Sequence, residues 1–171
     1  MTRVYGINRY RYGRVICLTL LLCGLNARPV VSQSISVTVN TPVEFGVLPP
    51  GIPGDPPDAV YENTMGDVRL SMRGGGGAAG LTWYVTVQKS TAGWHSGLTL
   101  EVRRDADARL IDGESYVSIP DAPTAAYFFR TNNARNVNNL DIQHRVELTQ
   151  PVPAATYSTT VTYTLIHGTP P

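Results

Sequence analysis

The chain has 171 residues, and its 14 basic and 13 acidic side chains give a formal net charge of +1 at pH 7. Five of the basic residues precede Gln33, where no acidic residue occurs, so the rest of the chain carries nine basic against 13 acidic residues, a net charge of about −4. A mildly acidic chain of this kind argues against nucleic acid or an anionic membrane as a partner.

Residues 1–32 are predicted to be a secretion signal. Four arginines and no acidic residue occupy positions 1–14, and an apolar run of about 11 residues follows at positions 15–25. A basic segment, a short apolar core and small residues behind it are the three parts of a signal peptide. The run is too short for a transmembrane helix, which needs roughly 20 residues, and no second apolar run follows it. We therefore expect a secreted or cell-surface protein without a transmembrane segment.

Two cleavage positions fit the small residues behind the apolar run, one near Ala27 and one near Ser32. Either cut removes Cys17 and Cys23, so we expect a secreted domain without a disulfide. Cys23 also suggests a lipoprotein signal, but the residue before it is Leu22, and lipidated cysteines normally follow a small residue; both alternatives stay open. Residues 33–171, about 140 in number, have the length of a single domain.

Alternation of apolar and polar residues predicts strands along most of this domain. The predicted strands cover residues 34–39, 43–47, 67–73, 81–88, 98–103, 116–119, 125–129, 139–148 and 157–167. Segments rich in Pro, Gly, Asn and Asp separate them, including a predicted long surface loop at 49–63 and a predicted solvated hairpin tip at 74–80. No helical period of useful length occurs after the signal. We predict an all-β, antiparallel β-sandwich of about 7–9 strands.

A cluster of carboxylates lies between residues 105 and 114. Its members are Asp105, Asp107, Asp112 and Glu114. Carboxylate oxygens on a loop are calcium ligands, although this spacing does not match an EF-hand loop. Three arginines between residues 103 and 109 are the alternative partners, as ion pairs in a solvated hairpin. The ion-pair interpretation is favoured, and we assign no metal and no cofactor.

The sequence contains no recognisable catalytic set. His95, His144 and His167 are too scattered for a metal site. His144 lies on the apolar face of its predicted strand, and we expect a hydrogen-bonded residue of the core or its rim. Ser96 follows His95 directly, but the surrounding residues do not match G-x-S-x-G. We therefore predict that the protein is not an enzyme and assign no catalytic residue.

Three aromatic residues are candidates for stacking on sugars. Trp83 shares a face with Leu81 and Val85, so core packing is the better interpretation for it. Trp94 lies in a predicted turn and is the expected exposed aromatic contact, with Tyr84 beside it in the same hypothesis. A secreted carbohydrate-binding module that uses Trp94 and Tyr84 is accordingly our alternative functional hypothesis.

Two segments resemble the ends of secreted pilin-like β-sandwiches. T-P-V-E-F-G-V-L-P-P-G at residues 41–51 is similar to their opening FG-x-x-x-PG element, and P-A-A-T-Y-S-T-T-V-T-Y-T-L at 153–165 is similar to their closing strand. Spore-coat-protein-U-like and WxL-like domains have such ends, and L-T-W-Y-V-T-V at 81–87 resembles the tryptophan strand of the latter. The cysteines of the former, and the second W-x-L element and LPxTG-like signal of the latter, are missing. The resemblance implies an immunoglobulin-like extracellular module with a structural or adhesive role.

The strand predicted at residues 34–39 would follow the cleaved signal directly. Ile35, Val37 and Val39 share one face of it, and a short alternating strand of this kind can add to the open edge of a neighbouring subunit. This leads to our first functional hypothesis, a pilus, filament or surface-layer subunit that assembles by strand exchange. Expected partners are further copies of the chain, other cell-surface proteins or glycans. The alternative, that the segment pairs within its own sheet, stays open.

Overall fold

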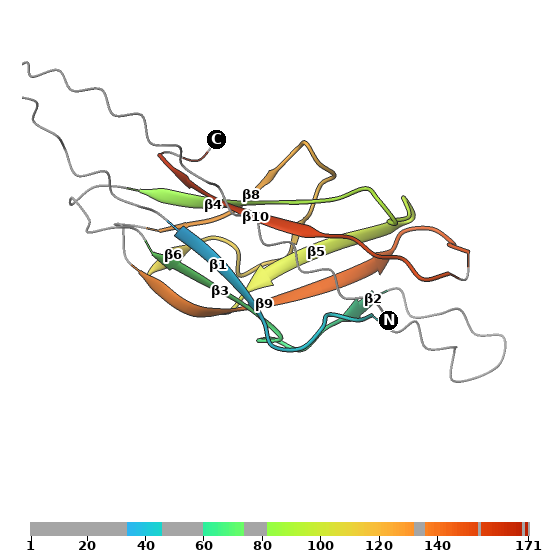
Figure 1. The fold of residues 1–171 in the computed structure, drawn as a ribbon, viewed down its shortest axis with the longest axis horizontal. Coiled ribbons are helices and arrows are strands. Elements are labelled where there is room, and N and C mark those ends of the chain that lie inside the picture. The colour runs from blue at the N-terminus through green and yellow to red at the C-terminus, as the bar shows by residue number, and fades with distance from the viewer. Residues whose placement is uncertain are drawn as a thin grey trace, which may run out of the picture. The chain divides into compact units, whose positions relative to one another are not determined.

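Ten strands form the regular structure of the described part of the chain (Figure 1). The structure, a computed structural model, describes residues 34–45, 60–73, 82–131, 136–153, 155–168 and 170. The predicted signal at 1–32, the glycine-rich segment 74–80 and most of the predicted loop 49–63 lie outside the described residues. The strands are β1 (Ser34–Val39), β2 (Val60–Glu62), β3 (Val68–Arg73), β4 (Trp83–Lys89), β5 (Leu98–Arg104), β6 (Leu110–Ile111), β7 (Val117–Ser118), β8 (Ala126–Thr131), β9 (Val137–Leu148) and β10 (Val161–His167).

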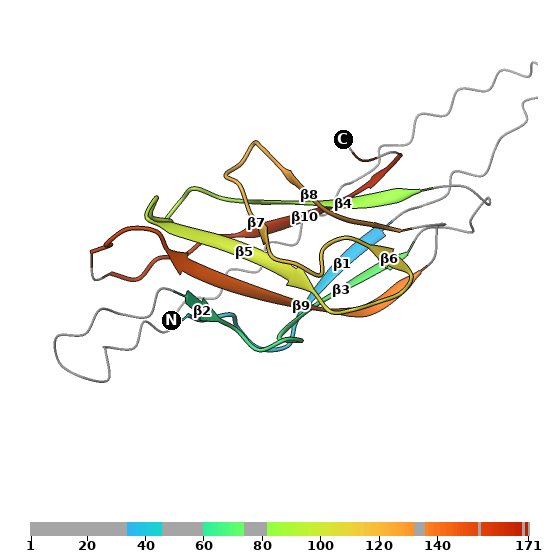
Figure 2. The ribbon, with the colours of Figure 1, turned by 180° about the vertical axis from the view of Figure 1, so that it is seen from behind.

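The strands form two antiparallel sheets, which Figure 2 shows from behind. The larger sheet has the order β1-β3-β9-β5-β7, with β2 also paired to β9, and the smaller sheet has the order β10-β4-β8-β6. The described residues include no helix. The prediction of an all-β fold with antiparallel sheets, as in a β-sandwich, is therefore confirmed. The strands outnumber the 7–9 expected because β2 and β6, of three and two residues, were not predicted.

From β3 onward, consecutive strands alternate between the two sheets, and among the described strands no ladder joins two that are adjacent in the sequence. The predicted hairpin at 74–80 is wrong, because the flanking strands β3 and β4 belong to different sheets. The carboxylate-rich segment 105–114 does lie between two antiparallel neighbours, β5 and β7 of the larger sheet, and the N–H of Arg104 donates to the carbonyl of Gly113 at 2.8 Å. The segment is longer than a simple hairpin loop, because β6 within it pairs with β8 of the smaller sheet. Alternation predicts a strand and its buried face, but it contains no information about the pairing partner.

The core lies between the sheets and consists of the apolar faces that the alternation predicts. Trp83, Val85 and Val87 of β4 are fully buried, as are Leu70 and Met72 of β3. Trp83 is thus a core residue, as expected. Each large apolar side chain that is completely buried contributes roughly 1.5–3 kcal/mol to the stability of the fold. Because the described residues include no cysteine, these buried faces provide the main stabilisation.

Three local predictions differ from the structure. Residues 41–45 are not a strand, although Val43 and Phe45 still pack against the core. The last strand begins at Val161 rather than at Tyr157, whose ring instead packs against His95 at 5.4 Å between centroids. β2, inside the predicted surface loop, was missed because a strand of three residues is too short to show a period.

Candidate functional site

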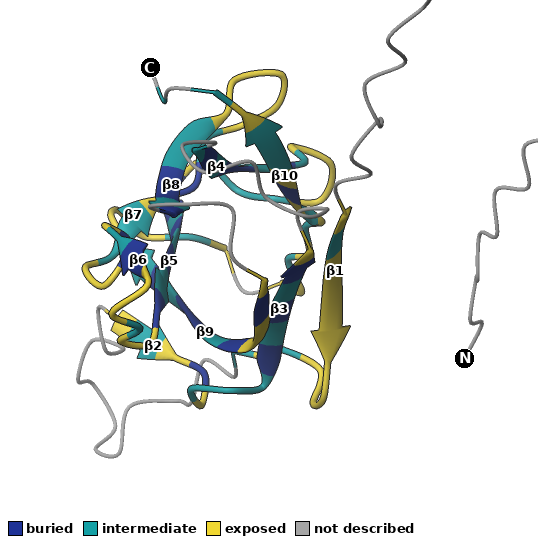
Figure 3. Cartoon of the chain, turned by 90° about the vertical axis from the view of Figure 1, so that its left-hand side faces the viewer, coloured by how far each residue is buried: buried dark blue, intermediate teal, exposed yellow. Residues whose placement is uncertain are grey.

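β1 is an edge strand of the larger sheet and pairs with β3 alone (Figure 3). The register places Val37 opposite Leu70 and Val39 opposite Val68, two residues of the core. Because directly opposite residues share a face of the sheet, both valines lie on the core-facing side. Val37 nevertheless remains 47% exposed and Val39 58% exposed, and only Ile35 of this face packs against the core. The apolar face of β1 is therefore aligned with the core without being covered by it.

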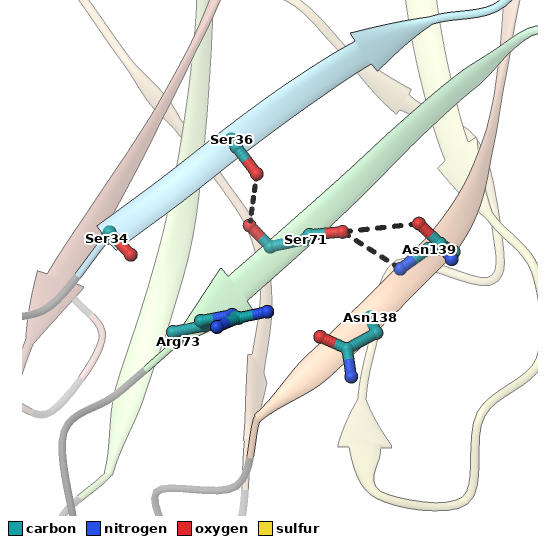
Figure 4. A pocket seen from close by; sticks show the side chains of 6 residues that line it. All are labelled: Ser34, Ser36, Ser71, Arg73, Asn138 and Asn139. Carbon is teal, nitrogen blue, oxygen red and sulfur yellow. Dashed lines mark hydrogen bonds between the residues drawn. The ribbon is translucent and has the colours of Figure 1, made fainter.

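The outer face of β1 is polar and borders an open depression of about 490 Å³ (Figure 4). The depression is lined by Ser34, Ser36, Ser71, Arg73, Asn138 and Asn139. The hydroxyl of Ser36 donates to the carbonyl of Ser71 at 3.4 Å, and beyond the strand the carboxamide of Asn40 donates to the carbonyl of Gly66 at 2.9 Å. Both bonds are exposed to solvent, so the backbone ladder and Ile35 contribute most of what holds β1 in place.

A β-bulge in β9 forms the far wall of this depression. Two residues, Asn138 and Asn139, lie opposite the single residue Ser71, and Asn139 has a positive φ of 53°. The backbone N–H of Asn139 donates to the Ser71 hydroxyl at 3.0 Å. A bulge lets two successive residues escape the usual alternation, so both asparagines are exposed between the buried residues Val137 and Leu140.

Five of the described strands pair with only one neighbour, and these edge strands differ in length and chemistry. β2 has three residues and β6 and β7 have two each, whereas β1 has six and β10 has seven. Neither β1 nor β10 contains proline or a Lys, Arg, Asp or Glu residue. The two long strands lie next to each other on one side of the sheets (Figure 3). Natural proteins protect sheet edges with short strands, proline or charge, and these devices are absent from β1 and β10.

A second feature is the loop that presents Trp94, between β4 and β5. Backbone hydrogen bonds join Ser90 to Thr160 at 2.9 Å and Ser158 to Gly93 at 2.9 Å. The indole N–H of Trp94 donates to the carbonyl of Leu98 at 2.8 Å. These bonds fix the loop to its neighbours, so Trp94 is half-buried and rigidly oriented rather than freely exposed.

Trp94 lines a depression of about 320 Å³ together with an ion pair that the sequence analysis missed. The lining residues are Lys89, Thr91, Trp94, Ser96, Leu98 and Asp121. The Lys89 ammonium contacts the carboxylate of Asp121 and lies 6.0 Å from the centre of the Trp94 ring. Lys89 continues the inward-facing series of Trp83, Val85 and Val87. A lysine at the next position of a buried face needs a partner, and this pattern could have indicated the ion pair from the sequence.

Tyr84 does not join Trp94 in one platform. Tyr84 lies near the start of β4 and Trp94 follows the end of this strand. The five steps along the strand from Tyr84 to Lys89 alone span about 17 Å. The Tyr84 ring packs instead against Tyr127 at 6.3 Å between centroids. The two aromatic residues that we predicted as one contact surface therefore lie at separate places.

The carboxylate cluster is divided among separate partners. The side chain of Arg109 donates to both carboxylate oxygens of Asp107, at 2.9 and 3.1 Å from its Nε, and this hydrogen bonding lowers the pKa of Asp107. The phenol of Tyr127 donates to Asp112 at 2.6 Å. Among the described residues, no group of three or more His, Cys, Asp or Glu side chains has a metal-binding arrangement.

Arg104 is the buried member of this region. Its guanidinium donates to the carbonyls of Asp112 at 2.6 Å and Asp105 at 2.9 Å, and it lies 3.3 Å from a carboxylate oxygen of Glu114. Arg104 also packs over the ring of Phe129 at 5.9 Å. The predicted ion-pair partners are thus present for Arg104 and Arg109, and the guanidinium of Arg104 joins the start of the segment between β5 and β7 to residues that follow β6.

The three histidines lie apart. His144 is 5% exposed and its Nε2 lies 2.7 Å from the phenol oxygen of Tyr163, so it is the hydrogen-bonded core residue that we expected. The Nδ1 atom of His95 accepts the backbone N–H of Gly97 at 3.0 Å, which stabilises the Trp94 loop. His167 is exposed at the end of β10. Each histidine therefore has its own local environment, and the three do not form a common site.

No protein-family model, curated protein sequence or solved structure matches this chain. None of the described residues belongs to a helix long and apolar enough to cross a membrane.

Proposed function

We propose that this chain is a non-enzymatic extracellular protein with a structural or adhesive role, an immunoglobulin-like β-sandwich that associates with further copies through β1. The observation that carries the proposal is the half-exposed apolar face of β1: Val37 and Val39 lie on the core-facing side of the sheet, yet they are 47% and 58% exposed. The signal-like residues 1–32 support export, since their three-part pattern is that of a signal peptide.

Exchange of β1 between copies conserves the pairing that the structure contains. The ladder from Ser34 opposite Arg73 to Val39 opposite Val68 has the same register whether β3 belongs to the same chain or to a neighbour. Exchange of an identical element is a low-cost route to association, because the contacts are retained and only the connection changes. The few side-chain contacts of β1 and the uncharged edge of β10 beside it favour this route.

Deletion of residues 33–40 tests the proposal. We expect the secreted chain to form filaments or oligomers in electron micrographs and by light scattering, and the shortened chain to stay monomeric. A synthetic peptide with the sequence of residues 33–40 should bind the shortened chain, because the edge of β3 that β1 normally occupies is then free. A full-length protein that is monomeric at all concentrations, or a shortened one that still assembles, contradicts the proposal.

A matched pair of substitutions identifies the face involved. Val37→Asp places a charge on the apolar face of β1, whereas Thr38→Asp places it on the outer face, one residue further along the same strand. Assembly that depends on the apolar face is lost in the first variant and retained in the second. Equal effects of both variants would indicate that charge at the edge, rather than burial of this face, decides association.

A further inference from the structure

We propose that the depression between Lys89, Asp121 and Trp94 binds a saccharide, one pyranose residue of a glycan lying against the indole. This site is separate from β1 and does not depend on assembly of the chain. The site differs in its residues from our alternative hypothesis. Tyr84 lies elsewhere, and the ion pair between the buried Lys89 and the exposed Asp121 takes its place as the partner of Trp94.

The polar half of the site is a lysine held in an apolar setting. The Lys89 side chain is only 7% exposed, while its partner Asp121 is 56% exposed. A lysine ammonium has three N–H donors, and Asp121 is the one side-chain partner that Lys89 has among the described residues. The ammonium of Lys89 therefore has N–H donors left for a ligand, and the exposed carboxylate of Asp121 can accept further hydrogen bonds.

Both members of the ion pair are held by the backbone. The N–H of Lys89 donates to the carbonyl of Pro120 at 2.9 Å, and the N–H of Ala122 donates to the carbonyl of Lys89 at 2.8 Å. The segment that carries Asp121 is thus joined directly to the end of β4. A ligand that meets this pair finds a donor and an acceptor in a fixed relation, which reduces the ordering cost of binding.

The apolar half of the site is the Trp94 ring. Its N–H is already bonded to the carbonyl of Leu98 and part of the ring packs against the core, so the ring contributes the apolar surface that remains exposed rather than a donor. Tryptophan combines a large apolar surface with a fixed orientation, and the bonds of the loop to Thr160 and Ser158 keep that orientation in the free protein.

These features fit a sugar better than other ligand classes. Neighbouring hydroxyls of a pyranose can accept from Lys89 and donate to Asp121, while the C–H face of the ring covers Trp94 and the hydroxyls of Thr91 and Ser96 border the site. A simple anion would be repelled by the Asp121 carboxylate, and a purely apolar ligand would leave the ion pair desolvated. The volume of about 320 Å³ lies at the small end of ligand pockets, roughly 300–1,000 Å³.

Saturation-transfer NMR of methyl glycosides tests the proposal on the secreted chain, because this method detects binding to monomers and assemblies alike. The probes are the methyl glycosides of glucose, galactose, mannose and N-acetylglucosamine, with glycerol and acetate as non-sugar controls. We expect saturation transfer to at least one glycoside, and at least a tenfold weaker affinity in Trp94→Leu and in Asp121→Asn. Tyr84→Ala is the matched aromatic control and should bind as the original chain does.

A second measurement needs no variant. Trp83 is fully buried, so the part of the tryptophan fluorescence that acrylamide quenches comes from Trp94, and a bound glycoside should reduce that quenching at least twofold.

Absence of saturation transfer for every glycoside overturns the proposal, as does binding that is unaffected by both Trp94→Leu and Asp121→Asn. Binding of acetate without binding of any glycoside also overturns it. Loss of assembly alone leaves the expected saturation transfer unchanged, so failure of this proposal is distinguishable from failure of strand exchange.

Discussion

The Nε2 atom of His144 lies 2.7 Å from the phenol oxygen of Tyr163, and this contact joins β9 of the larger sheet to β10 of the smaller one. Burial lowers the pKa of His144 to about 4 and raises the pKa of Tyr163 well above its ordinary value. Both side chains are therefore neutral at neutral pH. The two sheets are connected through their core by an uncharged hydrogen bond, and the Nδ1 atom of His144 has no partner among the described residues.

Stability should fall with decreasing pH because His144 is buried in its neutral form. Its pKa is about 4 in the folded chain against 6.5 in the unfolded one, so between these values the unfolded chain binds more protons. The contribution of His144 is fully present above pH 6.5 and is lost progressively down to about pH 4, a total of about 3 kcal/mol. Urea unfolding at pH 7.0, 5.5 and 4.5 measures it. A His144→Gln variant with the same pH dependence would contradict this assignment.

Removal of the Tyr163 hydroxyl should destabilise the fold. Tyr163→Phe leaves Nε2 of His144 without its partner in the core, and an unsatisfied buried polar group costs about 1–3 kcal/mol. Tyr157→Phe is the control, because the Tyr157 hydroxyl donates to the Pro153 carbonyl at an exposed position and should change the free energy of unfolding by less than about 0.5 kcal/mol. Urea denaturation of both variants gives the comparison, and equal effects would argue against a special role for the contact between the sheets.

Strand positions and buried faces were largely predictable from the sequence, and strand pairing was not. The alternation of Leu98, Leu100 and Val102 predicts a strand and its inner face, because a period of two is a local property of the backbone. That β5 lies between β9 and β7 depends on contacts between distant segments. The same reason explains why the hairpin predicted between β3 and β4 was wrong.

The candidate sites were predictable only in part. The apolar face of β1 was evident from the sequence, whereas the half-exposure of Val37 and Val39 depends on how the strand packs in the fold. Trp94 was identified as a contact residue, but its partners Lys89 and Asp121 are 32 positions apart and meet only in the fold. Alternation also failed at Asn138 and Asn139, because a bulge adds one residue to the strand without changing its composition.

Gly93 should be required for the position of the Trp94 loop. Its φ is +76°, and a Cβ atom there would lie 2.9 Å from the carbonyl oxygen of Ser158. Gly93→Ala therefore adds a backbone clash to the strain of a positive φ and should cost about 1–3 kcal/mol. Gly168→Ala is the matched control, because Gly168 has a φ of +129° with no atom within 4 Å of the added Cβ, so only strain applies. Urea denaturation gives both costs, and acrylamide quenching should show greater exposure of Trp94 in Gly93→Ala alone. Equal effects at the two glycines would contradict the importance of this close approach.

A disulfide between β1 and β3 should show whether β1 pairs within its own chain or with a neighbour. Ser36 and Ser71 lie directly opposite each other in the ladder, and both cysteines of the chain fall in the predicted signal, so Ser36→Cys with Ser71→Cys introduces the only thiols expected after secretion. Strand exchange predicts covalent multimers on electrophoresis without reductant, since each bond then connects two chains. Pairing within one chain predicts a cross-linked monomer, and that result in assembled material would contradict strand exchange. Each single-cysteine variant can form a dimer at most, which separates specific cross-linking across the ladder from random oxidation.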